Sequence, residues 1–232
     1  MTSLESLTLN EGLQTIHAYA FADAWNLKAI SIPDSVETIS VEAFYNAYKV
    51  ETLTIGTQSK LKSIGTKAFA SLTHVESINL PGSLERIDEG AFSDCSKLKH
   101  LVLPKSLTVL EENAFQNCVD LQSITIKSSS LWFGGGVFYD TWINNQNVKF
   151  SKTLKSSSYR DAGKEIALEC ENDKFCGCKR GYGNTLSDPE YFNCVQCSIG
   201  KTSDGGKQTA CSPCAAGTVS YTHLRAHETI AD

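Results

Sequence analysis

Apolar residues recur along the first two thirds of the chain at a spacing of about 23 residues. The stretch 75–97, VESINLPGSLERIDEGAFSDCSK, is matched position for position by 98–120, LKHLVLPKSLTVLEENAFQNCVD. Repetition of so short a unit predicts a solenoid, in which each coil buries its apolar face against the neighbouring coils. One phenylalanine marks each of six repeats, in steps of 23, 25, 23, 23 and 23 residues: Phe21, Phe44, Phe69, Phe92, Phe115 and Phe138.

Each repeat begins with the pattern of a half-buried strand. In the fourth repeat the apolar Ile78 and Leu80 alternate with the polar Ser77 and Asn79, the period of two that a strand requires. A proline then ends the strand in three repeats, because proline cannot donate to a strand ladder. These prolines are Pro33, Pro81 and Pro104.

The rest of the repeat predicts a second short extended segment and an outer turn. Residues 84–87 carry the second apolar step, and 88–95, with Ala91 and Phe92 together, predict a short helical turn. We expect the phenylalanine rings to stack from coil to coil. Each buried ring contributes about 1.5–3 kcal/mol, so the core grows with the number of repeats.

The unit L-x-x-I-x-L-P-x-S-L-x-x-I-x-x-x-A-F-x-x-C resembles the BspA-like class of leucine-rich repeats from residue 2 to about 141. The resemblance rests on L-P-x-S-L-x-x-I at 80–87, on the Ala-Phe pairs and on the cysteine after them. It implies a repeat solenoid over residues 1–150, β-rich with short helical turns. It also implies a surface or secreted protein used for adhesion and protein–protein contact. The third repeat has two extra residues near 56–60, which predict a loop bulge.

The outward positions of the first strands form a candidate binding face. The side chains of this face are mostly small, rich in hydroxyl groups and almost uncharged. Repeat proteins commonly bind their partners on the surface that such strands make. Serine and threonine also suit a solvated strand face with no ligand, so both interpretations stay open. One histidine alone makes no catalytic site. The candidate residues are Ser77, Asn79, His100, Val102, Ser123 and Thr125.

Cys95 and Cys118 occupy the same repeat position one coil apart. They could form a disulfide or a metal pair, or they could be small buried side chains in a ladder. We favour the ladder, because a buried free cysteine behaves as a small hydrophobe. Other repeats place small or apolar residues at this position: Ala24, Ala47, Leu72 and Thr141.

The sixth repeat is degenerate and predicts the end of the solenoid. Trp132, Phe133 and Trp142 are bulky enough to plug the open end of the core, and Val148 with Phe150 predicts a last strand. Residues 151–169 then form a capping or linking segment. From residue 156 this segment has a serine cap and helical composition, which predicts a short helix.

Residues 170–218 form a cysteine-rich region with few large apolar residues. Such a composition is normally held together by disulfides, in an oxidising compartment. The odd number of cysteines requires a partner outside this region or one free thiol. The cysteines are Cys170, Cys176, Cys178, Cys194, Cys197, Cys211 and Cys214.

Two short motifs in this region resemble extracellular modules. CGCKRGY at 176–182 resembles half of an EGF-like module, and CVQCSIGKTSDGGKQTACSPCAAGT at 194–218 resembles the cysteine-rich repeats of ephrin-receptor-like ectodomains. The second resemblance implies a pairing of Cys197 with Cys211. The other pairings cannot be deduced from sequence.

Zinc is the alternative to disulfides. Cys194, Cys197, Cys211 and Cys214 form C-x2-C-x13-C-x2-C, and four thiolates could hold a tetrahedral Zn²⁺. A single zinc site would leave three nearby cysteines unexplained, so we expect disulfides, no metal and no cofactor. The zinc alternative would make the chain an intracellular scaffold.

The last fourteen residues, 219–232, resemble no protein module. VSYTHLRAHET at 219–229 matches the translation of a transposase sequencing adapter residue by residue. We therefore expect this tail to be artefactual and the true chain to continue past Thr218, with a membrane anchor a further expectation. The chain also starts within a repeat, without a polar cap, which suggests a truncated beginning.

Charge and motifs narrow the function classes. The net charge is −5 and no basic stripe is present, so we expect no nucleic-acid partner. The sequence contains no run of about 20 apolar residues, so it predicts no membrane span. H-E-x-x-H, G-x-S-x-G and P-loop motifs are all missing, so we expect no enzyme. The sequence thus predicts a non-enzymatic adhesion or protein-interaction module at the cell surface or in secretion, bound to a protein, matrix or cell-surface partner.

Overall fold

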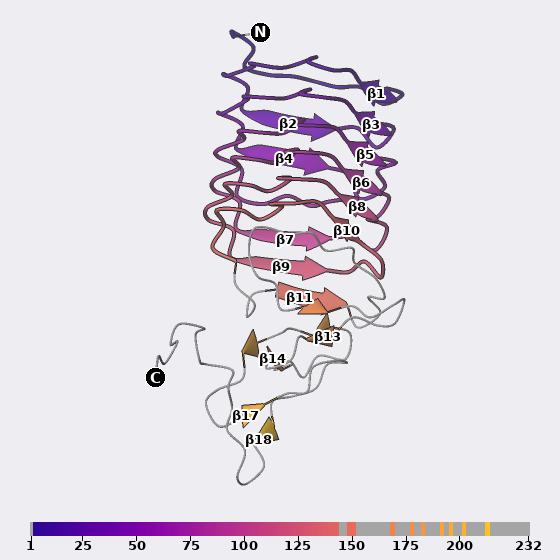
Figure 1. The fold of residues 1–232 in the computed structure, drawn as a ribbon. Helices are drawn as coiled ribbons and strands as arrows, with labels where there is room; N and C mark the ends of the chain where they lie inside the picture. Colours follow the sequence, from indigo (N-terminus) through magenta and orange to yellow (C-terminus); the bar gives the residue numbers. More distant parts are fainter. Residues whose placement is uncertain are drawn as a thin grey trace.

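The chain winds into a stack of coils, seen in a computed structural model of all 232 residues (Figure 1). The structure describes residues 2–143 and 148–151, and seven strands of two residues each between 168 and 213. Each coil of the repeat region contributes an extended segment on one side, a short strand on the next side and a turn. The solenoid predicted from the 23-residue period is confirmed.

The first side of the second, third, fifth and sixth coils carries a four-residue strand, and 148–151 add another. These strands are parallel and in register with the repeat, so that Ile30 lies beside Leu53 and Leu101 beside Ile124. Exposed and buried side chains alternate along them, as the sequence predicts. The strands are β2 (Ala29–Ile32), β4 (Thr52–Ile55), β7 (His100–Leu103), β9 (Ser123–Ile126) and β11 (Val148–Ser151).

The fourth coil interrupts this sheet. Its residues 77–80 alternate as a strand does, with Ile78 buried and Ser77 exposed, but their only β-bridge in the described part of the chain joins Ser77 to His100. The strands therefore form two groups, β2–β4 and β7–β9–β11. The interruption directly follows the two-residue insertion. There Thr57 and Gln58 form the predicted extra turn, closed by the Ser59 amide bonding to the Gly56 carbonyl at 3.2 Å.

The second side of the coils forms a continuous parallel sheet of six short strands. Its register is also that of the repeat, since Ile64 pairs with Ile87 and Ile87 with Leu110. The second extended segment predicted for each repeat is thus confirmed, in shorter form. The strands are β1 (Thr15–Ile16), β3 (Thr38–Ile39), β5 (Ser63–Ile64), β6 (Arg86–Ile87), β8 (Val109–Leu110) and β10 (Trp132–Phe133).

The L-P-x-S-L motif makes the corner between the two strands. The Leu84 amide donates to the Pro81 carbonyl at 3.2 Å, which closes a turn directly after the proline. The Ser83 hydroxyl donates to the carbonyls of Ser59 and Leu61 in the preceding coil, at 2.7 and 2.8 Å. The motif therefore combines a chain reversal with a hydrogen bond between coils.

The turn that contains the Ala-Phe pair is not helical, so the predicted helical turn is wrong. In the fourth coil the amides of Gly90, Phe92 and Asp94 donate to carbonyls of the next coil at 2.8–2.9 Å. The intervening amides of Ala91 and Ser93 donate to the carbonyl three residues earlier. An α-helix would instead bond every amide to the carbonyl four residues earlier. The alternation ties each turn to the next coil.

Left-handed backbone conformations make this alternation possible. Two positions of each turn, two residues before and two after the phenylalanine, have positive φ. Asparagine, aspartate and glycine tolerate this region best, and they hold eight of these twelve positions. The two sets are Tyr19, Glu42, Lys67, Gly90, Asn113, Gly136 and Asp23, Asn46, Ser71, Asp94, Asn117, Asp140.

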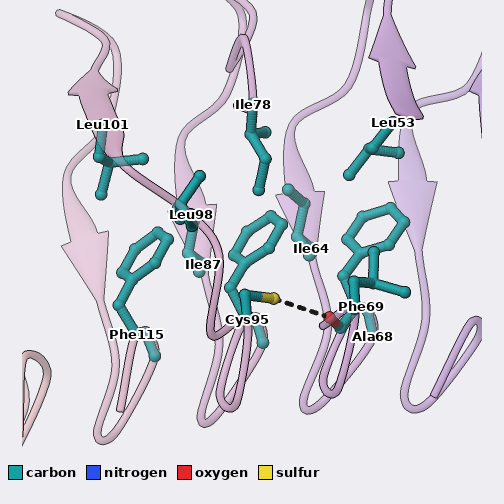
Figure 2. Close-up of a cluster of buried hydrophobic side chains, with 14 of the residues drawn as sticks. Leu53, Ile64, Ala68, Phe69, Ile78, Ile87, Cys95, Leu98, Leu101 and Phe115 are labelled. Carbon is teal, nitrogen blue, oxygen red and sulfur yellow. Dashed lines mark hydrogen bonds between the residues drawn. The ribbon is translucent and has the colours of Figure 1, made fainter. Parts of the chain in front are cut away.

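Stacked phenylalanine rings form the centre of the core, as predicted (Figure 2). The centroid distances along the column from Phe21 to Phe138 run from 5.1 to 6.0 Å, with the planes within 20° of parallel. Cys95 and Cys118 are buried and free, and their thiols donate to carbonyls of the preceding coil. The ladder of small buried side chains is therefore confirmed for these two cysteines.

The end of the repeat region is only partly as expected. Phe133 is buried and meets Phe138 edge to face, with the centroids 6.4 Å apart. Trp132 and Trp142 are 37% and 74% exposed, so they do not plug the core. Trp132 precedes the buried Phe133 in a strand, and alternation turns its side chain outward. The last strand predicted at Val148 is confirmed as β11, which pairs parallel to β9.

Seven short strands belong to the rest of the chain. β15 pairs antiparallel with β11 and so adds to the edge of the first sheet. The helix predicted from residue 156 lies outside the described residues, except for its last two, which form β12. The strands are β12 (Leu168–Glu169), β13 (Gly177–Cys178), β14 (Tyr182–Gly183), β15 (Tyr191–Phe192), β16 (Val195–Gln196), β17 (Lys201–Thr202) and β18 (Ser212–Pro213).

Candidate interaction face

The six residues proposed from the sequence lie together on the outer side of the first strands. We call this surface the strand face; its members are Ser77, Asn79, His100, Val102, Ser123 and Thr125. The register puts His100 beside Ser123 and Val102 beside Thr125, and the single bridge puts Ser77 beside His100. The first four are exposed and the last two are half-buried. Strand alternation produces this grouping, because every second side chain points away from the core.

His100 and Ser123 are joined across the two strands. The Nδ1 atom of His100 lies 2.8 Å from the Oγ atom of Ser123. This contact orients the imidazole across the two strands. Val102, 42% exposed, is the single large apolar side chain among the six. The face thus offers hydroxyl, amide, imidazole and one apolar group on a rigid backbone.

Charged side chains border the strand face on the side where the strands begin. Lys99 donates from Nζ to Oε2 of Glu76 at 2.7 Å, between neighbouring coils. The hydrogen bond and charge of Lys99 lower the pKa of Glu76. Because both side chains are largely solvated, this pair adds little stability. It does place charge at one border of an uncharged centre, and the centres of protein interfaces are likewise depleted of charged residues.

Sequence reasoning missed one charged residue of the strand face. Lys149 lies on β11 beside Thr125 and is exposed. The signal was present, since Lys149 stands between the apolar Val148 and Phe150 in the sequence, and strand alternation predicts that such a residue faces outward. The row of outward strand positions therefore continues from Thr125 to a positive charge on β11.

The described residues hold no group of three or more metal-ligating side chains. Burial raises the pKa of the Cys118 thiol well above its ordinary value, so this thiol stays protonated. A protonated, buried thiol is a poor nucleophile and a poor metal ligand. The cysteines of the predicted disulfide or zinc sites, Cys170, Cys176, Cys194, Cys197, Cys211 and Cys214, lie outside the described residues; Cys178 is described only as backbone of β13. No helix in the part of the chain described here is long and apolar enough to cross a membrane.

The sequence matches the BspA type leucine rich repeat region in six copies, over residues 1–118 and 53–162. Three solved structures are similar over most of the repeat region. The pneumococcal vaccine antigen PcpA is 27% identical, with a TM-score of 0.53 over 62% of this chain and 37% of that one. A leucine rich cell surface protein from Faecalibacterium prausnitzii is 19% identical, with a TM-score of 0.51 over 80% of this chain and 52% of that one.

The third structure is a leucine-rich repeat protein from Eubacterium ventriosum. It is 22% identical, with a TM-score of 0.50 over 61% of this chain and 44% of that one. The chain therefore spans only about a third to a half of the length of these three relatives. No curated protein matches the sequence significantly.

Proposed function

Because the chain belongs to the family of proteins with BspA-type leucine-rich repeats, we propose that it is a non-enzymatic interaction module of a surface or secreted protein. Leucine-rich repeats generally mediate protein interactions. The module binds a protein of the extracellular matrix or of a cell surface, and it does so through the strand face. Two similar structures are described as a cell surface protein and a vaccine antigen, which supports an extracellular location.

One observation carries the proposal: the strand face is exposed, weakly charged and held rigid over successive coils. Neighbouring coils are bonded along the turns and along the second sheet, and β7, β9 and β11 are also bonded along the first sheet, so the backbone of the face has little freedom to lose. A preorganised surface spends less conformational entropy on binding. The charged border, the imidazole and the exposed Val102 offer a partner both polar and apolar contacts.

The cysteine-rich region supports the same location. Seven cysteines within 45 residues, with few large apolar neighbours, are typical of disulfide-held extracellular modules. We propose that these cysteines form disulfides rather than a zinc site, with Cys197 and Cys211 as one pair. The strand face and the disulfides are separate proposals, and each can fail without the other.

Binding to purified extracellular proteins tests the strand face. The full chain is passed over immobilised collagen, fibronectin and laminin and over intact cells. Val102→Arg places a long charged side chain in the middle of the face. Thr108→Arg is the matched control, because Thr108 is also exposed but directly precedes β8 on the second side of the coil.

If the strand face is a binding site, the wild-type chain should bind saturably to at least one of the immobilised proteins or to the cells. Val102→Arg should then weaken this binding at least about tenfold, equivalent to 1.4 kcal/mol. Thr108→Arg should leave it unchanged. Equal binding by the Val102→Arg variant and the wild type would move the site off the strand face.

A further inference from the structure

Exposed large apolar side chains gather in the turns of the first two coils. Four of the nine in the described part of the chain lie there: Tyr19, Trp25, Val41 and Tyr48. Scattered exposed apolar residues are normal on a protein surface. A local concentration of aromatic side chains instead marks an interaction site.

Trp25 and Tyr48 form a stacked pair between neighbouring coils. Their ring centroids lie 6.2 Å apart and their planes 24° from parallel, while the side chains remain 41% and 38% exposed. The indole Nε1 donates to Oδ1 of Asp23 at 3.3 Å. Asn46 donates to the same oxygen from Nδ2 at 2.9 Å. We call Asp23, Trp25 and Tyr48 the aromatic corner.

The backbone beneath the aromatic corner is part of the rigid turn ladder. The Asp23 amide donates to the Tyr45 carbonyl of the next coil at 2.8 Å, and the Asn46 amide donates to Ala70 at 3.2 Å. The aromatic side chains are therefore held before any ligand arrives, which lowers the entropic cost of binding.

The solenoid does not need these rings. Thr73 and Ser96 hold the same repeat position in the third and fourth coils, and the turns there make the same inter-coil hydrogen bonds. Two aromatic side chains at exposed positions where neighbouring coils carry small polar ones are thus not explained by folding. The residues at this position, in order, are Trp25, Tyr48, Thr73, Ser96, Val119 and Trp142.

Residues 1–50, which include the first two coils, also account for most of the net negative charge of the chain, −4 of −5. Residues 1–50 hold six acidic and two basic side chains, net −4, whereas residues 51–118 hold eight and seven, net −1. The hydrogen bond from Asn46, followed by that from Trp25, lowers the pKa of Asp23. Asp23 is therefore a carboxylate at neutral pH, and it places a negative charge beside the indole ring of Trp25.

We propose that the aromatic corner binds an arginine side chain presented by a protein partner. A guanidinium group stacks on the face of tryptophan or tyrosine and gains a cation–π interaction. The Asp23 carboxylate supplies the opposite charge beside the rings. This surface lies on the turns, apart from the strand face, so the inference does not rest on the proposed function.

The positive charge of the neighbouring Lys49 repels a cationic ligand, so its removal distinguishes a cation site from an anion site. Lys49 donates from Nζ to Oδ1 of Asn26 at 2.7 Å, next to the aromatic pair. Asn26 is neutral, so the positive charge of Lys49 is not compensated there. Removing it should strengthen the binding of a cation and weaken the binding of an anion.

The test uses a peptide of defined charge. Biotinylated Gly-Arg-Ser-Arg-Gly amide is immobilised and compared with the same peptide carrying neutral citrulline in place of arginine. The full chain should bind the arginine peptide at least about threefold more tightly, and added salt should weaken this binding. Equal binding of the two peptides, or no binding of either, would overturn the proposal.

Variants drawn from the repeat itself locate the site. Asp23→Asn copies Asn46, and Trp25→Thr copies Thr73, so both preserve the turn. Each should weaken binding of the arginine peptide about threefold or more, and Lys49→Gln should strengthen it. Val119→Thr is the matched control at the same repeat position in the fifth coil, and it should change nothing. Equal losses in Val119→Thr and Trp25→Thr would also overturn the assignment.

Discussion

The ring of Phe92 stacks on the ring of Phe115, with the centroids 5.2 Å apart and the planes 4° from parallel. Both rings are fully buried, and Phe92 meets Phe69 in the same way on its other side. A stack of identical contacts along the axis explains why the repeat period is so strict. Each coil presents the surface that the next coil needs.

Phe92→Ala should therefore lower the free energy of unfolding by about 3–5 kcal/mol, because it opens a cavity between two coils. Urea unfolding of the full chain measures the loss. Phe21→Ala is the control, since Phe21 is half-buried and stacks on one side only, and it should cost less. A loss below about 1 kcal/mol for Phe92→Ala would contradict the stacked core.

The serine of the L-P-x-S-L motif should also matter for stability. Ser83→Ala removes a hydroxyl that donates to two carbonyls of the preceding coil, and we expect a loss of about 1–2 kcal/mol. Ser77→Ala, on the exposed strand face, should leave the free energy of unfolding unchanged within about 0.5 kcal/mol. Equal effects of the two substitutions would show that the bond between coils is not stabilising.

Substitution of two glycines by alanine tests whether the left-handed backbone conformation of the turn matters for stability. Gly90 has a φ of +59°, whereas Gly82 has neither a positive φ nor any atom within 4 Å of an added Cβ. Gly90→Ala should destabilise the protein by about 1–2 kcal/mol, because alanine disfavours the left-handed region. Gly82→Ala should be neutral or slightly stabilising. Thermal melting of the two variants makes the comparison, and equal melting temperatures would contradict the left-handed turn.

Burial of Cys118 predicts a loss of stability in alkali. The pKa of its thiol is raised in the folded protein above the ordinary value of 9.0, chiefly because burial disfavours the thiolate. The unfolded chain therefore releases this proton first, and the contribution is complete below about pH 9 and falls as the pH rises beyond it. Unfolding titrations at pH 8 and pH 10 measure the difference.

Cys118→Ala should reduce this alkaline loss, and alanine is the residue that the first two coils use at the same position. A pH dependence that is the same in the variant and the wild type would contradict the assignment. The two buried thiols should also resist alkylation until the chain unfolds.

The cysteine-rich region should contain disulfides. Mass analysis of the intact chain without reductant should show paired cysteines, with Cys197 linked to Cys211 after proteolysis. Zinc bound stoichiometrically to free thiols of Cys194, Cys197, Cys211 and Cys214 would contradict this prediction. It would then favour the intracellular scaffold.

The sequence predicts the coils and their register well, because a fixed period places equivalent residues beside each other. The period alone is enough to place Ile64, Ile87 and Leu110 beside one another in the second sheet. The turn around Ala91 and Phe92 was wrongly predicted to be helical, because its composition suits a helix. Its backbone amides in fact alternate between bonds within the turn and bonds to the next coil, and composition does not reveal that pattern. The abundance of asparagine, aspartate and glycine at the left-handed positions was the available signal. The prediction that Trp132 plugs the core was wrong because it rested on the size of the side chain, whereas strand alternation turns Trp132 outward and Phe133 inward.

The strand face was predicted as a set, since alternation fixes which side chains point outward. Neither Lys149 nor the aromatic corner emerged from the sequence. Lys149 belongs to a coil that has lost the repeat consensus, and Trp25 and Tyr48 become a pair only when the coils stack. Contacts between successive coils at variable positions are the part of the site that a consensus pattern cannot show.

Footprinting of the bound chain tests the central claim, binding through the strand face, most directly. Hydroxyl-radical labelling is carried out on the full chain alone and in complex with the matrix protein or cell surface that it binds. Binding through the strand face requires that His100 and Val102 become protected in the complex while Trp132 and Tyr139 are labelled as before. Unchanged labelling of His100 and Val102, with protection elsewhere, would contradict it.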